Sequence, residues 1–311
     1  MHVFHDLKDI SSRTGATSVA IGNFDGIHVG HQSLIRGMLE KAKSEKLTPT
    51  VLTFFPHPVE VLKPQKKLER LTTTSEKLAL LENMGVEQVL VAHFDTALSQ
   101  VSPSDFFRDY LVEGLKSRSI HVGFNFCFGK DREGNTDTLR MLCENQNIFL
   151  KVEEQVNSNG ERVSSSVVRK LLAEGEVAHA ARFLGRPYSI TGQVIKGDQR
   201  GRKLGFPTAN LRCPQDKALP KNGVYVTQVQ WQKEELKAVT NVGVRPTFTG
   251  EGAPPLIEVH LLDFNSQIYD EFLTVEFLGR IRDEKKFSGL EELKAQIEKD
   301  LSFCHKAFDL L

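Results

Sequence analysis

The stretch "SVAIGNFDGIHVGHQSL", residues 18–34, joins a short apolar run to the start of a helical pattern. Residues 18–22 have the composition of a buried strand, and Leu34, Ile35 and Met38 recur with helical spacing. The segment between them is therefore predicted to be the turn from the carboxyl end of a strand to the N-terminus of a helix. Unpaired backbone N–H groups and the helix dipole make such a turn attractive to phosphate.

Apolar runs and helical patterns alternate along the first half of the chain. Strand-like runs occupy 48–54, 86–94 and 119–126, and helical patterns begin at about Gly30, around 75 and around 103. This βαβα order predicts an α/β domain with a parallel, Rossmann-like sheet covered by helices. Ligands of such sheets bind at the carboxyl ends of the strands, where the quoted turn would lie.

The hydrophobic pattern of the sequence changes near residue 185. Extended segments with period-two alternation follow without intervening helices, at 224–230, 257–264 and 273–281. They predict a mostly β domain built as a small antiparallel barrel, so we place the two domains at 1–186 and 187–311. A closing helix is predicted from a capping box and an apolar stripe, formed by Ser288 with Glu291 and by Leu290, Leu293, Ile297 and Leu301.

The overall composition bounds the class of protein. The chain has 311 residues with 40 basic and 40 acidic side chains, so no net field would attract nucleic acid or an anionic membrane. The four cysteines include no C-x-x-C pair, which argues against a zinc site or a disulfide framework. No apolar run approaches the roughly 18 residues of a membrane span. We therefore expect a cytoplasmic protein without nucleic-acid or membrane partners; its oligomeric state stays open.

His28 and His31 give the turn its chemistry. Three residues apart, they can face the same side of the helix start and offer N–H donors to a triphosphate without adding a nucleophile. Taken alone, H-x-x-H also describes two ordinary surface histidines. Gly22 and Gly30 would let the backbone approach a phosphate closely.

The segment "GNFDGIHVGH" closely resembles the G-x-F-D-x-x-H-x-G-H signature of the nucleotidyltransferase superfamily. Together with "TFFPHP" (53–58), it is similar to the N-terminal module of the prokaryotic bifunctional riboflavin kinase/FAD synthetase family. The resemblance implies that His28 and His31 hold the phosphates of ATP while an adenylyl group moves. It also assigns Gly22, Asp25 and Gly30 to nucleotide binding.

A second anion site is predicted at "RVSSSVVRKLL" (162–172). Its serines can cap a helix, and Arg169 lies one turn after Ser166. An ordinary helix cap with a solvated arginine is the alternative. The segment resembles the family's phosphate motif, often I-S-S-T-x-x-R, with Val163 and Ser166 as mild departures. The resemblance implies that Ser165, Ser166 and Arg169 bind phosphate.

The segment "HVGFNFCFGKDREGN" (121–135) alternates phenylalanines with small and polar residues before a glycine-bearing loop. A core strand followed by a turn accounts for most of this pattern. Its resemblance to the family's flavin-contacting segment implies that Asn125 and Phe128 contact the flavin.

The segment "GDQRGRKLGFPTANL" (197–211) combines glycines and cations, which suit a loop folded over phosphates. In an extended chain Thr208 and Asn210 point the same way, and two neutral oxygens beside phosphates suit Mg²⁺. A proline turn leading into a strand is the alternative. "GFPTANL" resembles the P-T-A-N motif of riboflavin kinases, which assigns Gly197, Arg202 and Gly205 to phosphate binding and Thr208 and Asn210 to the metal.

Glu258 lies in the strand-like segment "IEVHLLDF". With Ile257 and Val259 facing the core, Glu258 is predicted on the opposite face, beside His260. A solvated surface carboxylate is the alternative reading. Riboflavin kinases use a glutamate base on a later strand, and the resemblance assigns that role to Glu258.

These patterns lead to one functional prediction. The chain would phosphorylate riboflavin to FMN with ATP and Mg²⁺, and would then adenylylate FMN to FAD with release of pyrophosphate. Its partners would be the small molecules riboflavin, FMN and ATP. Two alternatives remain: a chain with one active site and one decayed site, or a flavin- or nucleotide-binding regulator without turnover. A pure binding protein would have no need of the general base at Glu258.

Overall fold

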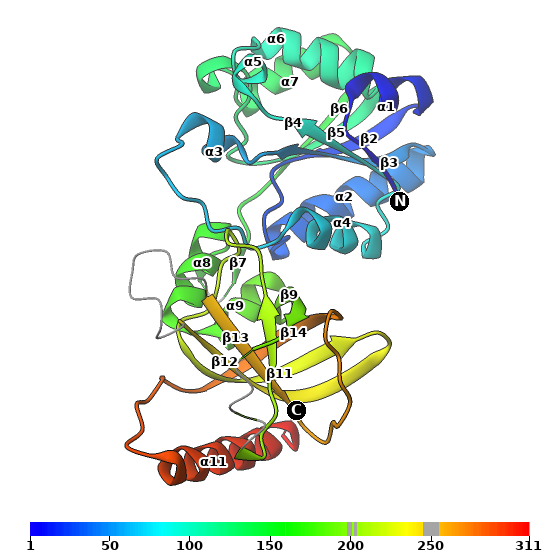
Figure 1. Ribbon diagram of the computed structural model, residues 1–311. Helices are drawn as coiled ribbons and strands as arrows, with labels where there is room; N and C mark the ends of the chain where they lie inside the picture. Colours follow the sequence, from blue (N-terminus) through cyan, green and yellow to red (C-terminus); the bar gives the residue numbers. More distant parts are fainter. Residues whose placement is uncertain (159, 198–200, 202–203, 245–254, 311) are drawn as a thin grey trace. The chain divides into compact units, whose positions relative to one another are not determined.

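The computed structural model describes residues 1–158, 160–197, 201, 204–244 and 255–310. The chain forms two compact units, Met1–Ser165 and Ser166–Leu311. Each unit is described by itself (Figure 1).

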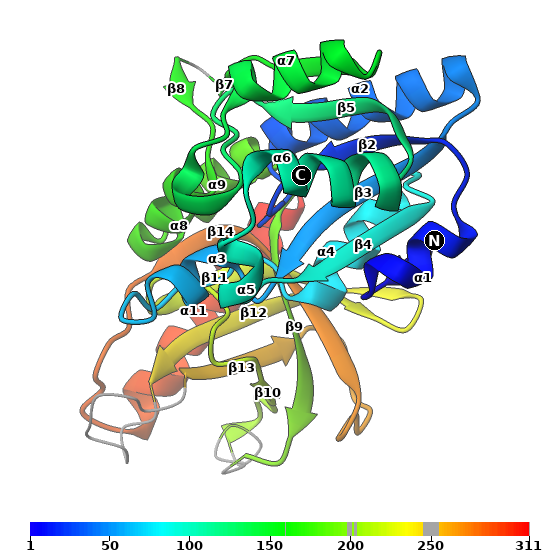
Figure 2. The same cartoon turned by 90° about the horizontal axis from the view of Figure 1, so that it is seen from above.

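The first unit is built on a six-stranded parallel sheet with the strand order β1-β4-β3-β2-β5-β6. Figure 2 shows β5, β2, β3 and β4 side by side. The strands are β1 (His2–Phe4), β2 (Thr17–Ile21), β3 (Thr48–Phe55), β4 (Gln88–His93), β5 (Ser117–Gly123) and β6 (Phe149–Glu153), and a separate hairpin consists of β7 (Asn157–Ser158) and β8 (Glu161–Arg162).

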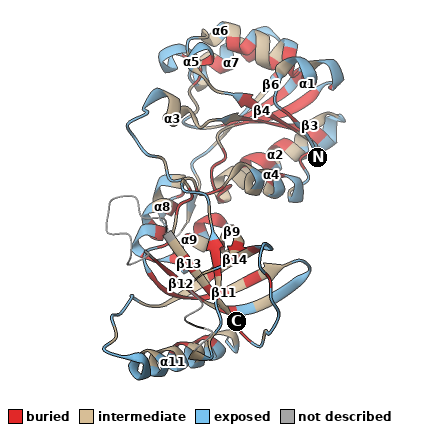
Figure 3. Ribbon diagram, in the orientation of Figure 1, coloured by how far each residue is buried: buried red, intermediate tan, exposed pale blue. Residues whose placement is uncertain are grey.

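Helices cover both faces of this sheet. On one face α2 (Val29–Glu45) and α4 (Thr74–Asn83) pack against Ala20, Val51 and Val89. The opposite face is covered by α1 (Leu7–Arg13), α6 (Pro103–Phe106), the π-helix Phe107–Gly114 and α7 (Thr136–Asn145). Three short helices lie in the connections: α3 (Pro58–Leu62), α5 (Thr96–Ser99) and the 3₁₀ turn Lys130–Arg132. Figure 3 shows the buried residues along the strands and on the inward helix faces.

The strand order changes direction at β2. The chain passes from β2 to β3 and β4 on one side, whereas β5 and β6 lie on the other side. Ligands of open α/β sheets bind at such a switch point, outside the carboxyl ends of the strands. The loops after β2 and β5, which hold the predicted nucleotide and flavin residues, therefore flank the expected binding crevice.

The second unit contains a closed antiparallel barrel with the order β10-β13-β12-β11-β14-β9. Two helices precede it, α8 (Ser165–Glu174) and α9 (Val177–Leu184), and α9 contacts β9 and β14. The strands are β9 (Tyr188–Ile195), β10 (Ala209–Arg212), β11 (Gly223–Trp231), β12 (Glu234–Val244), β13 (Pro255–Leu261) and β14 (Phe272–Arg282).

The closing helix α11 (Leu290–Phe308) packs on β11, β12 and β14. Its buried Asp300 accepts two hydrogen bonds from Arg282 Nε, each of 3.0 Å, and one of 2.7 Å from Arg282 Nη2. The predicted capping box was wrong by one residue. The helix begins at Leu290, so its third position is Glu292, and Glu292 accepts from both the backbone N–H and the hydroxyl of Ser288. Leu290 itself is exposed, at 66%.

The predicted fold class is confirmed: a helix-covered parallel sheet is followed by an antiparallel barrel and a C-terminal helix. The boundary at 186/187 stays a prediction, and by contacts α9 and most of α8 group with the barrel. Among the described residues no helix is both long and apolar enough to span a bilayer.

Candidate functional sites

His28 is the N-cap of α2. Its Nδ1 accepts a hydrogen bond of 3.2 Å from the backbone N–H of His31, and its side chain is 8% exposed. Because Nδ1 is the acceptor, a neutral His28 carries its proton on Nε2. The helix start therefore fixes both the ring and the tautomer, and leaves Nε2–H as a donor.

The ring of His31 stacks on that of His28, with centroids 3.6 Å apart and an interplanar angle of 12°. Burial lowers the pKa of His28 to about 4, against weaker opposing effects of a backbone hydrogen bond and Asp25. Burial, with the nearby His28 and Lys77, also lowers the pKa of His31 well below its usual value. Both rings are thus neutral near pH 7, and each has one N–H for a phosphate oxygen.

The turn between β2 and α2 has an unusual backbone. Phe24 and Ile27 have φ angles of 50° and 41°, and both side chains are buried. A β-branched residue in the left-handed region is costly, and such strain gathers at functional sites. A Cβ at Gly30 would lie 3.3 Å from the His28 ring, and one at Gly22 would lie 3.1 Å from the Phe24 ring. The two glycines thus leave room for the rings of the turn.

Asp25 ties this turn to the segment before α4. Its carboxylate accepts from the backbone N–H of Leu71 at 3.0 Å and from that of Thr72 at 3.1 Å, and the Thr72 hydroxyl lies 3.3 Å away. The backbone N–H of Gly26 donates to the same hydroxyl. Asp25 is 5% exposed, so the structure gives its side chain a positional task. Its role in nucleotide binding stays a prediction.

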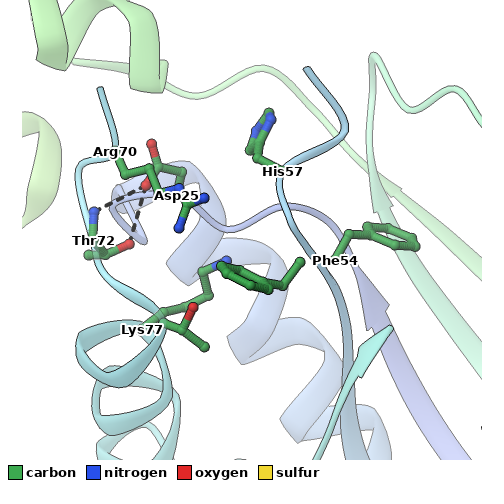
Figure 4. Close-up of a pocket in the computed structure, with 8 residues that line it drawn as sticks. Asp25, Phe54, His57, Arg70, Thr72 and Lys77 are labelled. Atoms are coloured by element: carbon green, nitrogen blue, oxygen red, sulfur yellow. Dashed lines mark hydrogen bonds between the residues drawn. The ribbon is translucent and has the colours of Figure 1, made fainter. Parts of the chain in front are cut away.

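A small hollow of about 20 Å³ opens beside this turn (Figure 4). Arg70 in its wall forms a salt bridge of 2.7 Å with Glu60, and its guanidinium lies 4.9 Å from the centroid of the Phe55 ring. Two phenylalanines thus lie beside an arginine, a lysine and a histidine at the carboxyl edge of the sheet. The lining residues are Asp25, Phe54, Phe55, His57, Arg70, Thr72, Thr74 and Lys77.

Lys77, in the second turn of α4, lies at the base of the hollow. Its Nζ donates to the backbone carbonyl of Asn23 at 2.7 Å and to Thr53 Oγ1 at 3.4 Å. Burial lowers its pKa to about 8; Asp25 opposes this shift and Arg70 adds to it. The lysine is therefore in direct contact with the turn that carries the histidines.

At the start of α8, the Ser165 hydroxyl donates to the backbone carbonyl of Asp25 at 2.9 Å. The predicted phosphate segment thus touches the histidine turn through its second serine. Ser166 and Arg169 follow in the same helix and group with the second unit. Their roles stay predictions.

The predicted flavin loop follows β5, which ends at Gly123 rather than extending to 126. A turn begins there, because the backbone N–H of Phe126 donates to the carbonyl of Gly123. Asn125 is exposed, whereas Phe128 is 6% exposed and stacks on Phe126 with centroids 5.4 Å apart. Phe128 thus belongs mostly to the core, and flavin contacts of both residues stay predictions.

In the second unit, strand register brings two predicted kinase residues together. Asn210 on β10 pairs directly with Glu258 on β13, and Glu258 pairs with Asn241 on β12. Directly opposed residues project from the same face of a sheet. Ile257 and Val259 are buried in the barrel, so this row lies on its outer face, as predicted for Glu258.

The P-T-A-N segment is attached to this row. The backbone carbonyl of Pro207 lies 2.8 Å from Nδ1 of His260, which is two residues beyond Glu258. A Cβ at Gly197 would clash with the Asn210 side-chain amide, so a larger residue there would force that amide to shift. Gly205 has a φ of +89°, and Thr208 is exposed. Arg202 lies outside the described residues.

The sequence reasoning missed Lys77, Arg70, Thr72 and His57. Two signals are present in the sequence: residues 63–70 are rich in basic side chains, and "TFFPHP" carries part of the family resemblance. Nothing in the sequence places Lys77 beside Asn23, because that contact spans 54 residues and depends on the packing of α4.

The fold and the two clusters define a two-part nucleotide-dependent transferase. A family model described as FAD synthetase matches residues 10–167, and one described as riboflavin kinase matches residues 184–308. The chain belongs to the family of bifunctional riboflavin kinases/FMN adenylyltransferases.

Three curated relatives with that name support the assignment. The protein of Buchnera aphidicola subsp. Schizaphis graminum is 34% identical, covering 99% of this chain and 98% of that one. The proteins of Bacillus subtilis and Escherichia coli K12 are each 37% identical, covering 96% and 94% of this chain and 95% and 93% of their own.

A solved structure from Streptococcus pneumoniae, titled a macrolide-efflux protein, is 31% identical with a TM-score of 0.88. The match covers 97% of this chain and 98% of that one. The similarity concerns the fold, and the role in that name is a statement about the other protein. The predicted family is confirmed by the family models and the curated relatives.

Proposed function

We propose that the chain makes FAD from riboflavin in two steps, one on each unit. The barrel unit transfers the γ-phosphate of ATP to riboflavin, which gives FMN and ADP. The α/β unit transfers an adenylyl group from a second ATP to FMN, which gives FAD and pyrophosphate. Two separate clusters carry this proposal: the His28–His31 turn at the switch point of the sheet, and the Asn210–Glu258 row on the barrel.

In the kinase reaction, Glu258 takes the proton of the ribityl 5′-hydroxyl as the hydroxyl oxygen attacks the γ-phosphorus and ADP leaves. The hydroxyl of Thr208 and the amide oxygen of Asn210 would hold Mg²⁺, because hard oxygen donors fit that ion and the Asn210 amide is held against Gly197. The bound ion would offset the charge that develops on the phosphates. Gly197, Arg202 and Gly205 would shape the phosphate loop.

In the adenylyl transfer, a phosphate oxygen of FMN attacks the α-phosphorus of ATP and pyrophosphate leaves. The protein supplies positioning and electrostatic stabilisation. His28 Nε2–H and one N–H of His31 donate to phosphate oxygens, and the negative charge of those oxygens favours protonation of the rings. Ser165, Ser166 and Arg169 bind the same phosphates, and Asn125 and Phe128 contact the flavin.

One incubation tests the proposal. Purified protein is given riboflavin, ATP and Mg²⁺, and the flavins are separated by chromatography. FMN together with FAD is expected. If FMN is the only product, the chain has a single active site. If neither FMN nor FAD forms, the chain is a binding protein. The cytoplasmic location and the absence of nucleic-acid partners stay predictions.

A further inference from the structure

Lys77 is a charged residue to which the proposed reaction assigns no role. Its hydrogen-bond partners among the described residues, the carbonyl of Asn23 and the hydroxyl of Thr53, are neutral oxygen atoms. The oxygens of nearby Asp25 are already bonded by the backbone N–H groups of Leu71 and Thr72. An ammonium has three donors, and a partly desolvated cation is costly unless an anion approaches it.

The hollow above Lys77 has the size and the wall of a site for one anionic group. At about 20 Å³ it can take an oxygen or two of a phosphate and is too small for a ring. Arg70 in the same wall is engaged by Glu60 through two guanidinium nitrogens. Lys77 is therefore the cation best placed to receive a further anion there (Figure 4).

We propose that Lys77 is a substrate-binding residue of the adenylyl transfer, whose ammonium donates to a phosphate oxygen of FMN or ATP while it holds the Asn23 carbonyl. The inference rests on the proposed function and adds to it. One side chain would thus join the anionic substrate to the turn that carries His28 and His31. A phosphate bound there would also stabilise the charged form of the lysine.

The burial of Lys77 allows a role in substrate binding to be distinguished from a role in stabilising the fold. Burial lowers the pKa of Lys77 to about 8, so its charge opposes folding rather than supporting it. Removal of that charge is expected to leave the melting temperature unchanged or higher and to weaken catalysis. Such a trade-off is typical of groups retained for function.

The experiment compares Lys77→Met and Lys77→Arg in the full chain, with Lys43→Met on the exposed face of α2 as the matched control. FAD formation is measured from supplied FMN and ATP, and FMN formation from riboflavin. For Lys77→Met we expect a loss of about 10²-fold in kcat/KM of adenylyl transfer, with kinase activity and melting temperature kept. The arginine variant should recover most of the loss. A rise in KM for FMN alone, or for ATP alone, identifies which phosphate is bound.

The pH dependence gives a second readout. The groups around the ammonium are Asp25, which favours its charge, and Arg70, which opposes it; His31 lies nearby as a neutral ring. In the parental chain adenylyl transfer should fall as pH rises through about 8. In the arginine variant this alkaline limb should move to higher pH, and in the methionine variant it should disappear.

Binding of pyrophosphate and binding of FMN, each measured by calorimetry on the full chain, need no turnover. We expect Lys77→Met to weaken one of the two about tenfold relative to the Lys43→Met control, pyrophosphate if Lys77 holds ATP and FMN if it holds FMN. Unchanged adenylyl transfer in Lys77→Met, or equal loss of both activities with a lower melting temperature, would overturn the inference. Failure of the proposed function would appear differently, as a parental chain that makes no FAD, and the two binding measurements would still test Lys77.

Discussion

The two sites of this chain are built by different physical means. The histidine site depends on a buried turn with two non-glycine residues at positive φ, a helix cap, and a carboxylate that is engaged in holding a neighbouring segment. The kinase site depends on strand register, which sets Asn210, Glu258 and Asn241 in one row on an outer face. A site of the first kind couples chemistry to burial, whereas a site of the second kind places one half-buried carboxylate on a rigid strand ladder. Substitutions should therefore act differently in the two units.

The largest expected effect comes from separating the units. A fragment 187–311 should make FMN and no FAD, because the histidine turn is absent. It should also be less stable than a fragment 166–311, since Phe183 and Leu184 of α9 are 1% and 0% exposed in the full chain and α9 contacts β9 and β14. Loss of each such side chain costs about 1.5–3 kcal/mol. Chromatography of flavins and thermal melts of both fragments provide the measurement. A folded 166–311 fragment without kinase activity would contradict the assignment of the barrel.

Glu258→Gln tests whether the row on the barrel carries a general base. The change keeps the size and hydrogen bonding of the side chain and removes its ability to accept the hydroxyl proton. Kinase turnover should fall by about 10²- to 10⁴-fold, while FAD formation from supplied FMN continues at the parental rate. The matched control is Glu298→Gln on the exposed face of α11. Near-parental riboflavin phosphorylation, with single-turnover kinetics showing chemistry to be rate-limiting, would make Glu258 an ordinary surface carboxylate.

His28→Asn tests the buried site with its helix cap retained, since asparagine is a favourable N-cap. Adenylyl transfer should fall by about 10²- to 10³-fold through loss of one preorganised phosphate donor. Kinase activity should be unchanged. His5→Asn, at an exposed position before α1, is the control. Parallel loss of both activities would point to misfolding rather than to a missing donor.

The sequence pattern was sufficient to predict those elements that are specified by residues within a single segment. The helix predicted to begin around residue 75 is observed at Thr74–Asn83, because its apolar spacing and its cap at Thr73 act within one segment. Beyond Gly123 the pattern failed: alternating phenylalanines suggested a strand, but the chain turns there and Phe128 packs on Phe106 and Phe126.

In the candidate sites, too, local features could be predicted from the sequence, whereas features that depend on tertiary packing could not. Register placed Glu258 on the outer face of the barrel as period-two alternation predicted. The hollow at Lys77 could not be predicted, because it joins the turn at 23–25 to residues 70–77, and no local rule links those segments. The neutral state of the two histidines also depends on burial that only the fold supplies.

The smallest expected effect concerns a histidine outside both proposed reactions. His121 on β5 is 2% exposed, its Nε2 lies 2.9 Å from Ser119 Oγ, and its Nδ1 is buried without a hydrogen-bond partner among the described residues. Burial, with Lys41 and Lys151 nearby, lowers its pKa to about 4. The unfolded chain, with a histidine pKa of about 6.5, therefore binds more protons than the folded chain between these two values.

Stability must then decrease as pH falls from about 6.5 toward 4, and the contribution of His121 lost by pH 5 is about 2 kcal/mol. His121→Gln keeps a hydrogen-bonding group near Ser119 and removes the titration. We expect the free energy of unfolding, measured with urea, to fall between pH 7.5 and pH 5.0 in both proteins. In the variant this fall should be smaller than in the parental chain by that amount. His28 and His31, also neutral by burial, should keep part of the acid sensitivity in place. His5→Gln at its exposed position serves as the control, and an equal reduction in both variants would mean that burial of His121 has no part in the acid response.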